Sequence, residues 1–199
     1  IPTMMQLIQE GKEPDVLFWV GCAGSYDQRY KSVTWAIIKI LNKLKINFAV
    51  LGEEESCTGD PARRAGDEFT FQMQALMNIE VLNGYQVKKI LTACPHCFNT
   101  IKNEYPVLGG KYEVVHHSQF LQGLINEGKL KMQGGGEFKG KRITYHDSCY
   151  LGRANAIYEA PRAVLQQLDT DLVEMASRKK NGLCCGAGGS QMFKDAEKG

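Results

Sequence analysis

Apolar residues follow two alternating patterns along the chain. Continuous apolar runs are typical of strands covered on both faces, and apolar residues three or four positions apart are typical of one helix face. These patterns predict strands over 16–20, 48–51, 89–93 and 112–115 and helices over 33–44, 69–81, 98–101 and 120–125. The alternation of strands with helices predicts a parallel sheet with helices on both faces. We expect Phe69, Met73 and Met77, which share one helix face, to pack in the core.

The alternation breaks once and then restarts. Residues 129–141 are rich in glycine and lysine and have no periodicity, which is typical of a linker. After them the pattern predicts a strand over 142–147, a helix over 163–168 and a strand over 172–175. We therefore expect an α/β fold of two duplicated Rossmann-like parallel-sheet units, a first cysteine-rich unit over 1–128 and a second, truncated unit over 142–199.

The seven cysteines support this duplication. Thirty-four residues lie between Cys22 and Cys57, the same number lies between Cys149 and Cys184, and the second pair follows the first at an offset of 127. A Cys-x-x-Cys motif at 94–97 follows the first pair, and the same offset would place its counterpart near position 221, beyond the 199 residues of the sequence. We therefore expect one complete four-cysteine site and a second that lacks its final motif.

The predicted strands place these cysteines at one edge of a sheet. In doubly wound sheets, sites gather outside the carboxyl ends of the strands. Cys22 and Cys94 directly follow predicted strands, and Cys57 lies in a loop after one. Together with Cys97, these thiolates can complete the coordination of an iron–sulfur cluster or of one tetrahedral zinc ion. The glycine-rich turn over 184–190 favours a cluster, because its backbone N–H groups can bond to cluster sulfides.

The composition is that of an ordinary globular protein. Hydrophobic residues make up 43% of the chain and charged residues 23%, and the formal net charge is +2. No apolar run is long enough to span a bilayer, and no basic stripe indicates nucleic-acid binding. The first residues do not resemble a secretory signal. An odd number of clustered cysteines suits a reducing cytosol with metal-bound or redox thiols.

The duplicated pattern Cys-x34-Cys-Cys-Gly followed by Cys-x-x-Cys resembles the cysteine-rich CCG domain family. Its most specific parts here are Cys-Tyr-Leu-Gly-Arg at 149–153 and Cys-Cys-Gly-Ala-Gly-Gly at 184–189. The family includes the B-type subunit of heterodisulfide reductase and the iron–sulfur subunits of glycolate oxidase and of lactate utilisation. The resemblance implies [4Fe-4S] clusters and electron transfer within a flavin-linked oxidoreductase.

The resemblance also implies ligands and partners. It assigns Cys22, Cys57, Cys94 and Cys97 to the first site and Cys149, Cys184 and Cys185 to the second. The expected partners are a flavoprotein, which would carry the flavin, and a ferredoxin-type iron–sulfur subunit. The expected location is the cytoplasm, and it is compatible with peripheral attachment to the inner face of the membrane through those partners.

The first site departs from the family pattern at Thr58, which stands where the family has a second adjacent cysteine. Four ligands suit a cubane cluster or zinc better than a five-cysteine, non-cubane cluster. Only the second site, through Cys185, would form the five-thiolate cluster. We expect the two sites to face each other across a pseudo-two-fold axis.

Two other functions each explain part of the pattern. Zinc in the first site would make the chain a structural or docking module. A thiol–disulfide oxidoreductase would use Cys94-Pro95-His96-Cys97, with the first thiol made acidic at a helix N-terminus. This second alternative does not account for the duplicated pairs.

The residues near the cysteines have simpler interpretations. We expect His116 and His117 to be a loop or helix-cap pair rather than metal ligands, and Glu53–Glu55 to form a solvated loop. His146 either has a structural role or bonds to the sulfur of Cys149.

Overall fold

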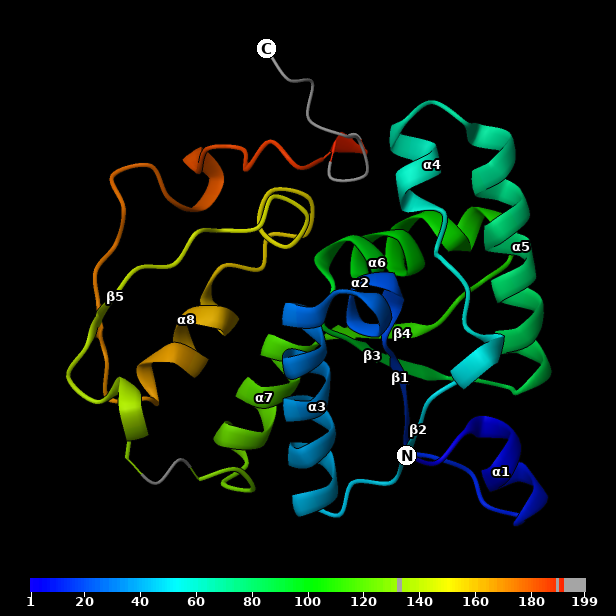
Figure 1. The fold of residues 1–199 in the computed structure, drawn as a ribbon, viewed down its shortest axis with the longest axis horizontal. Coiled ribbons are helices and arrows are strands. Elements are labelled where there is room, and N and C mark those ends of the chain that lie inside the picture. The colour runs from blue at the N-terminus through cyan, green and yellow to red at the C-terminus, as the bar shows by residue number, and fades with distance from the viewer. Residues whose placement is uncertain (132–133, 189, 192–199) are drawn as a thin grey trace.

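The computed structural model describes residues 1–131, 134–188 and 190–191 and shows an α/β protein with two parallel sheets (Figure 1). The α-helices are α1 (Met4–Gln9), α2 (Gly21–Tyr26), α3 (Gln28–Lys43), α4 (Asp60–Arg64), α5 (Glu68–Gly84), α6 (Pro95–Asn99), α7 (His117–Asn126) and α8 (Glu159–Gln166). The strands are β1 (Val16–Trp19), β2 (Phe48–Ala49), β3 (Lys89–Thr92), β4 (Glu113–His116), β5 (Arg142–Ile143) and β6 (Asp171–Leu172). No helix in the described ranges is long and apolar enough to cross a membrane.

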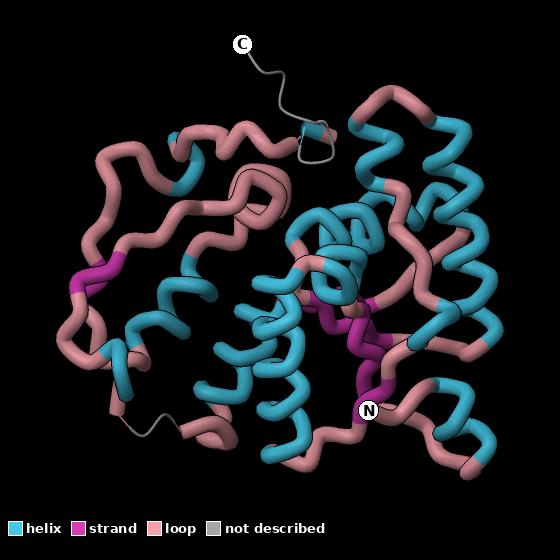
Figure 2. The backbone as a smooth tube through the Cα atoms, in the orientation of Figure 1, coloured by secondary structure: helices cyan, strands magenta, loops and turns pink. Residues whose placement is uncertain are grey.

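Four parallel strands form the main sheet, in the order β2-β1-β3-β4. β1 lies between two neighbours, so Leu17 pairs with Ala49 of β2 and with Ile90 of β3. β4 extends the sheet on the far side of β3. Helices cover both faces of the sheet (Figure 2). The predicted α/β class and the parallel arrangement are confirmed.

Alternate side chains of β1 pack against different helices. Leu17 and Trp19 belong to a core cluster with residues of α5 and α6, whereas Val16 and Phe18 belong to a cluster with residues of α3. Trp19 is fully buried. Burying a large apolar side chain of this kind contributes roughly 1.5–3 kcal/mol. The strand is therefore fixed from both sides, and the loop that follows Trp19 begins from a rigid position.

Helix α5 buries a different face from the predicted one. Phe69, Met73 and Met77 are 76%, 49% and 57% exposed, so the prediction that they pack in the core is wrong. The buried residues of this helix are Phe71, Ala75, Asn78, Ile79 and Leu82. Apolar residues occur on both sides of α5, so the periodicity of the sequence does not select the side that meets the sheet.

The second half of the chain contains a smaller parallel sheet. β5 pairs with β6, and α8 lies between them in sequence. Both strands are shorter than predicted, because each pairs with only two residues of the other. Arg162 of α8 is buried and donates to Asp147 at 2.7 Å and to Glu174 at 2.6 Å. The division into units over 1–128 and 142–199 remains a prediction, and residues 132–133 of the proposed linker lie outside the described residues.

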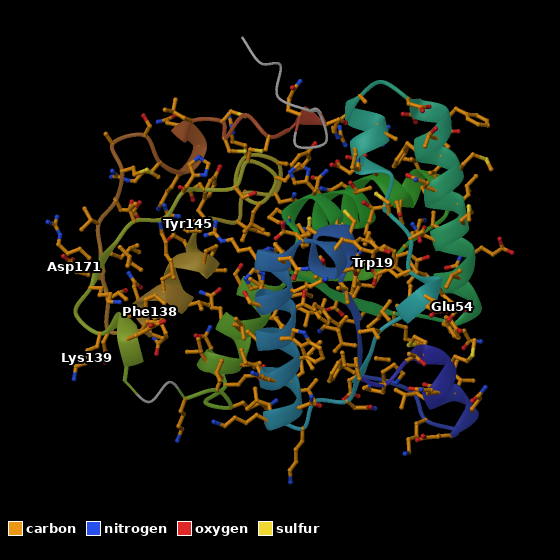
Figure 3. The ribbon with its side chains drawn as sticks, viewed as in Figure 1. Trp19, Glu54, Phe138, Lys139, Tyr145 and Asp171 are labelled. Carbon is orange, nitrogen blue, oxygen red and sulfur yellow. The ribbon has the colours of Figure 1, made fainter. Side chains whose placement is uncertain are left out.

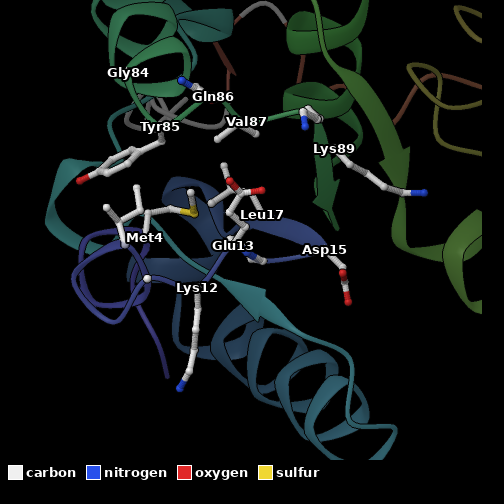
Figure 4. A pocket seen from close by; sticks show the side chains of 14 residues that line it. Met4, Lys12, Glu13, Asp15, Leu17, Gly84, Tyr85, Gln86, Val87 and Lys89 are labelled. Carbon is white, nitrogen blue, oxygen red and sulfur yellow. The ribbon is translucent and has the colours of Figure 1, made fainter.

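The two edges of the main sheet differ in chemistry. A pocket of about 620 Å³ lies at the amino ends of β1 and β3, where Met4, Tyr85 and Lys89 contribute to its lining (Figure 4). None of the cysteines lines this pocket. The cysteine-bearing loops leave the opposite, carboxyl edge, so this pocket and the candidate chemistry are separate.

Candidate metal centre

Three loops at the carboxyl edge of the main sheet carry the thiols of the first site. Cys22 follows β1 in the first turn of α2, Cys57 lies in the loop after β2, and Cys94 and Cys97 lie at the start of α6 after β3. Cys97 is buried and the other three are half-buried. All four are free thiols. The four predicted ligands of the first site therefore lie at the same edge of the sheet.

The Cys97 sulfur lies against both of the other loops. A Cβ atom built on Gly21 would lie 3.3 Å from Cys97 Sγ, and the Thr58 hydroxyl donates to the same sulfur at 4.0 Å. Gly21 has a φ of 77°, a conformation that favours glycine. Gly21 is thus needed both for the turn and for the space that Cys97 occupies. Thr58 is 2% exposed, so its hydroxyl is enclosed within the site.

The thiols form two hydrogen-bonded pairs of unequal acidity. The Cys57 thiol donates to Cys22 and, helped by backbone N–H groups, lowers the pKa of Cys22 to about 6. The same hydrogen bond raises the pKa of Cys57. In the other pair, the hydrogen bond from Cys97 lowers the pKa of Cys94 to about 7. Each pair readily holds one thiolate, so metal binding must displace mainly the remaining proton of each pair.

Two buried side chains hold the Cys57 loop. Asn78 donates to the Cys57 carbonyl at 2.9 Å and accepts from Ser56 at 2.9 Å. The Tyr105 hydroxyl donates to the Thr58 carbonyl at 3.2 Å and accepts from Asn78 at 3.1 Å. Asn78 and Tyr105 are both almost completely buried. The backbone around Cys57 is therefore attached to α5 and to the turn after α6.

The Glu55 carboxylate joins the loop after β2 to the loop after β1. Its two oxygens accept the backbone N–H groups of Val20 at 3.0 Å and Gly21 at 2.5 Å. Burial raises the pKa of Glu55 to about 7, although the two N–H groups partly oppose this. The prediction of a solvated loop is therefore wrong for Glu55. The N–H groups at the Gly21 turn need an acceptor, and Glu55 supplies both of its oxygens.

A second buried carboxylate lies beside the Cys-x-x-Cys motif. Asp60, which is 3% exposed, accepts from His96 Nδ1 at 2.7 Å and from Arg64 at 3.0 Å. Burial alone would raise the pKa of Asp60, but these hydrogen bonds outweigh burial and lower it. Burial would likewise lower the pKa of His96, but its bond to Asp60 raises it. His96, which lies between the two cysteines in sequence, is thus held by its hydrogen bond to Asp60.

The donor set fits the cofactors that the sequence indicates. Four thiols are soft ligands that suit both iron–sulfur clusters and zinc. Trp19 Nε1 is a buried donor with no hydrogen-bond partner in the described residues, and its ring belongs to the same core cluster as Cys97 (Figure 3). Cluster sulfides accept such bonds. Within the described residues, no three His, Cys, Asp or Glu side chains already surround a single-ion position, so the thiol pairs must adjust on binding.

The second site is not assembled in the same way. Cys149 is half-buried, whereas Cys184 and Cys185 are exposed, and neither hydrogen-bonds to Cys149 in the described part of the chain. The Gly186 N–H does donate to the Cys184 sulfur at 3.4 Å, as expected for a turn that supplies backbone donors. Gly189 of the same turn lies outside the described residues. Assignment of these three cysteines as ligands remains a prediction.

The histidines have structural contacts. His116 is the N-cap of α7. Its ring accepts from the Ser118 N–H, and its backbone N–H donates to the Gln119 side chain, so the cap is confirmed for His116. The ring Nε2 of His146 lies 2.9 Å from the Leu183 carbonyl oxygen. This contact connects the loop before Cys149 with the loop before Cys184, and it supports the structural interpretation of His146.

Sequence reasoning missed three residues of the first site: Glu55, Asp60 and Asn78. Asn78 was detectable as a polar residue inside an otherwise apolar helix, where an unpaired amide is costly. The position of Glu55, two residues before Cys57, was a weaker signal. Asp60 follows the Cys-x-Gly turn but gives no sign in the sequence that it meets His96.

Two segments of the chain, residues 16–102 and 143–199, match the family model described as "Cysteine-rich domain". The chain belongs to the cysteine-rich CCG domain family. This membership confirms the resemblance inferred from the spacing of the cysteines. The matched segments contain all seven cysteines.

Three proteins that are similar to this CCG chain have names that denote oxidoreductases or their subunits. It is 46% identical over 191 residues to an "EtfAB:quinone oxidoreductase" of Syntrophomonas wolfei, covering 96% of this chain and 26% of that protein. It is 45% identical over 200 residues to the "Probable iron-sulfur-binding oxidoreductase FadF" of Bacillus subtilis, covering 100% and 28%. It is 40% identical over 183 residues to one subunit of the "Dihydromethanophenazine:CoB--CoM heterodisulfide reductase" of Methanosarcina barkeri, covering 88% and 43%.

The CCG chain thus spans about a quarter of the length of the first two relatives, at 26% and 28%. The activities named for those proteins therefore belong to chains that are much longer than the segment aligned here. No solved structure matches the chain.

Proposed function

We propose that this chain carries electrons within a flavin-linked oxidoreductase, through a [4Fe-4S] cluster held by the thiolates of Cys22, Cys57, Cys94 and Cys97. The observation that carries this proposal is the meeting of three loops at the Cys97 sulfur, with Gly21 and Thr58 against it. The names of the relatives, which denote an iron–sulfur-binding oxidoreductase and a heterodisulfide reductase subunit, support the same function. When bound, such a cluster supplies a one-electron carrier.

The chain's own residues would hold and shield this carrier. Glu55 fixes the turn that presents Cys22, and Asn78 fixes the loop that presents Cys57. The N–H groups in the first turn of α6 and the Thr58 hydroxyl are donors beside the thiolates, and donors to thiolates raise the reduction potential. The rigid attachment of each loop keeps the ligand sulfurs in place while the charge changes.

Electrons would enter from a flavoprotein and leave toward a quinone or a disulfide. The printed names of two relatives, a quinone oxidoreductase and a heterodisulfide reductase subunit, motivate these two acceptors. Cys149, Cys184 and Cys185 would form the second site, and the exposure of Cys184 and Cys185 suits contact with a partner. A ferredoxin-type subunit is a further expected partner. The complex would lie in the cytoplasm or peripherally at the inner face of the membrane.

Two alternatives have a specific observation in their favour. Four thiols without a fifth suit zinc as well as a cubane cluster, so zinc could hold the loops for docking. The lowered pKa of Cys94, about 7, in contact with Cys97 suits a thiol–disulfide oxidoreductase. The zinc protein would be colourless, and the thiol–disulfide enzyme would be metal-free.

Anaerobic purification with analysis of iron, sulfide and zinc tests the proposal. We expect iron and sulfide in the wild-type protein, with visible charge-transfer absorption. Cys57→Ser and Cys94→Ser should each lose most of the iron of the first site, because each removes one of four ligands. Cys184→Ser is the matched control, since this exposed cysteine belongs to the other predicted site. If Cys57→Ser and Cys94→Ser keep wild-type iron and zinc, the site assignment is wrong.

A further inference from the structure

The loop that carries Cys149 lies against the helix that carries Cys94 and Cys97. The rings of Tyr150 and His96 have centroids 4.3 Å apart at an angle of 50°. The guanidinium of Arg64 lies 5.5 Å from the centre of the Tyr150 ring. His96 is therefore enclosed between Asp60 of α4 and Tyr150 of the second half of the chain.

The next residue of the same loop enters the core of the first half. Leu151 is 1% exposed and belongs to the apolar cluster that contains Cys97 and Phe98. A leucine buried to this extent contributes roughly 1.5–3 kcal/mol, so this contact is not incidental. The loop is thus anchored in the core of the first half as well as against His96.

Asn155 makes two hydrogen bonds to the first half and one within its own segment. Its amide donates to Asn99 at 3.0 Å and to the Tyr150 carbonyl at 2.7 Å, and its oxygen accepts from Asn103 at 2.9 Å. Asn99 is the last residue of α6. The segment 150–155 therefore contacts both ends of the short helix, at His96 and at Asn99.

We infer that the segment 150–155 of the second half is a structural part of the first metal site, positioning the helix that carries Cys94 and Cys97. The inference rests on the proposed function, because it concerns retention of the cofactor at that site. Helix α6 has five residues and continues directly into a five-residue π-helical segment, Thr100–Glu104. A helical stretch of this length is too short to be stable by itself, so its position depends on tertiary contacts. Tyr150, through His96, and Asn155, through Asn99, supply such contacts, and Leu151 packs in the apolar cluster that contains Cys97.

The consequence is that the first site is complete only when the second half is docked. Without the Tyr150 ring, His96 is held on one side alone, by Asp60, and α6 gains freedom to rotate. Movement of α6 carries Cys97 away from Gly21 and Thr58. Cofactor retention by four cysteines of the first half therefore depends on a residue that neighbours Cys149.

Release of iron to a chelator tests this inference in the full protein carrying Cys184→Ser and Cys185→Ser, which disable the second site. The difference in bound iron between this parent protein and the same protein with Cys94→Ser added gives the amount of iron held at the first site. In this background we expect Tyr150→Ala to release that iron about two- to ten-fold faster, the factor that corresponds to one lost aromatic contact. Tyr150→Phe should release iron at the parent rate, because the ring is retained.

Tyr145→Ala is the matched control. Tyr145 also lies in the second half, but its ring packs on Arg162 at 5.3 Å and not on α6 (Figure 3). Its substitution should leave the release rate unchanged. An unchanged rate in Tyr150→Ala, or an equal acceleration in Tyr145→Ala, would overturn the inference. Absence of iron and sulfide from the parent protein would instead contradict the proposed function, and the same release assay on bound zinc would then test the contact.

Discussion

Acid should destabilise this protein through two neutral histidines at the start of α7, the buried His116 and the half-buried His117. Burial, together with the charge of its neighbour, lowers the pKa of His116 to about 3, and burial lowers that of His117 to about 4. His116 Nδ1 accepts from the Ser118 N–H at 3.3 Å, and Nε2 lies 3.1 Å from the Ala93 carbonyl oxygen. This geometry fits the neutral ring with its proton on Nε2, since Nδ1 accepts from the Ser118 N–H and lies 2.8 Å from Ser118 Oγ.

The sign and size of the effect follow from the two states. In the unfolded chain a histidine has a pKa of about 6.5, so below that pH the unfolded state binds more protons than the folded state. The stability is therefore fully present above about pH 6.5 and is lost as the pH falls toward the folded pKa values. At pH 5 each unfolded histidine gains about 2 kcal/mol by protonation. The pair together removes about 4 kcal/mol of unfolding free energy between pH 8 and pH 5.

Urea unfolding of the reduced, metal-free protein at pH 8 and pH 5 measures this difference. His116→Gln and His117→Gln should each make the drop in unfolding free energy smaller by about 2 kcal/mol than in the wild type. His146→Gln is the control, because His146 is exposed and should leave the drop unchanged. Other titrating groups are common to all these proteins and cancel in the comparison. A drop that stays the same in both His116→Gln and His117→Gln would refute the reasoning.

Three further predictions concern the fold and the loops of the site. Chelation should leave most of the far-ultraviolet circular dichroism, because the two apolar clusters on the main sheet do not need metal, and loss of nearly all of it would contradict this. Asn78→Ala should lower the unfolding free energy by about 2–4 kcal/mol, since it leaves the buried Cys57 carbonyl and Tyr105 hydroxyl short of a partner; a urea-measured loss well under about 1 kcal/mol would argue against a role in holding the loop. Arg162→Met should lower the unfolding free energy by about 3 kcal/mol or more, because Asp147 stays buried without its cation. The same urea titration measures this loss, and Arg142→Met, at an exposed ion pair, is the comparison that should lose much less.

The sequence predicted the structure best where the residues of a single element are enough to show which of its faces are buried. The run at 16–20 is apolar on both faces, so β1 could be predicted as a covered strand, and the positions of Cys22 and Cys94 at strand ends followed from it. The face of α5 could not be predicted, because Phe69 and Phe71 offer apolar residues on opposite sides and only the packed sheet distinguishes them. Glu55 and Asp60 were missed for a related reason. Their partners, the Gly21 turn and His96, are more than 30 residues away and meet them only in the folded chain.

In the strand order β2-β1-β3-β4, the central strand β1 pairs with β3, which is synthesised much later. The first metal site can therefore form only late in synthesis. β1 is made first but pairs with β3 only later, so a nascent chain that has emerged as far as Cys57 displays two thiols before the sheet that holds them is complete. The set of four is complete only after Cys97 has left the exit tunnel, and its outer support only after Asn155. A cofactor that needs all four thiols can be bound only after that point, and a nascent chain that has emerged only as far as α5 would expose Cys22 and Cys57 to oxidation.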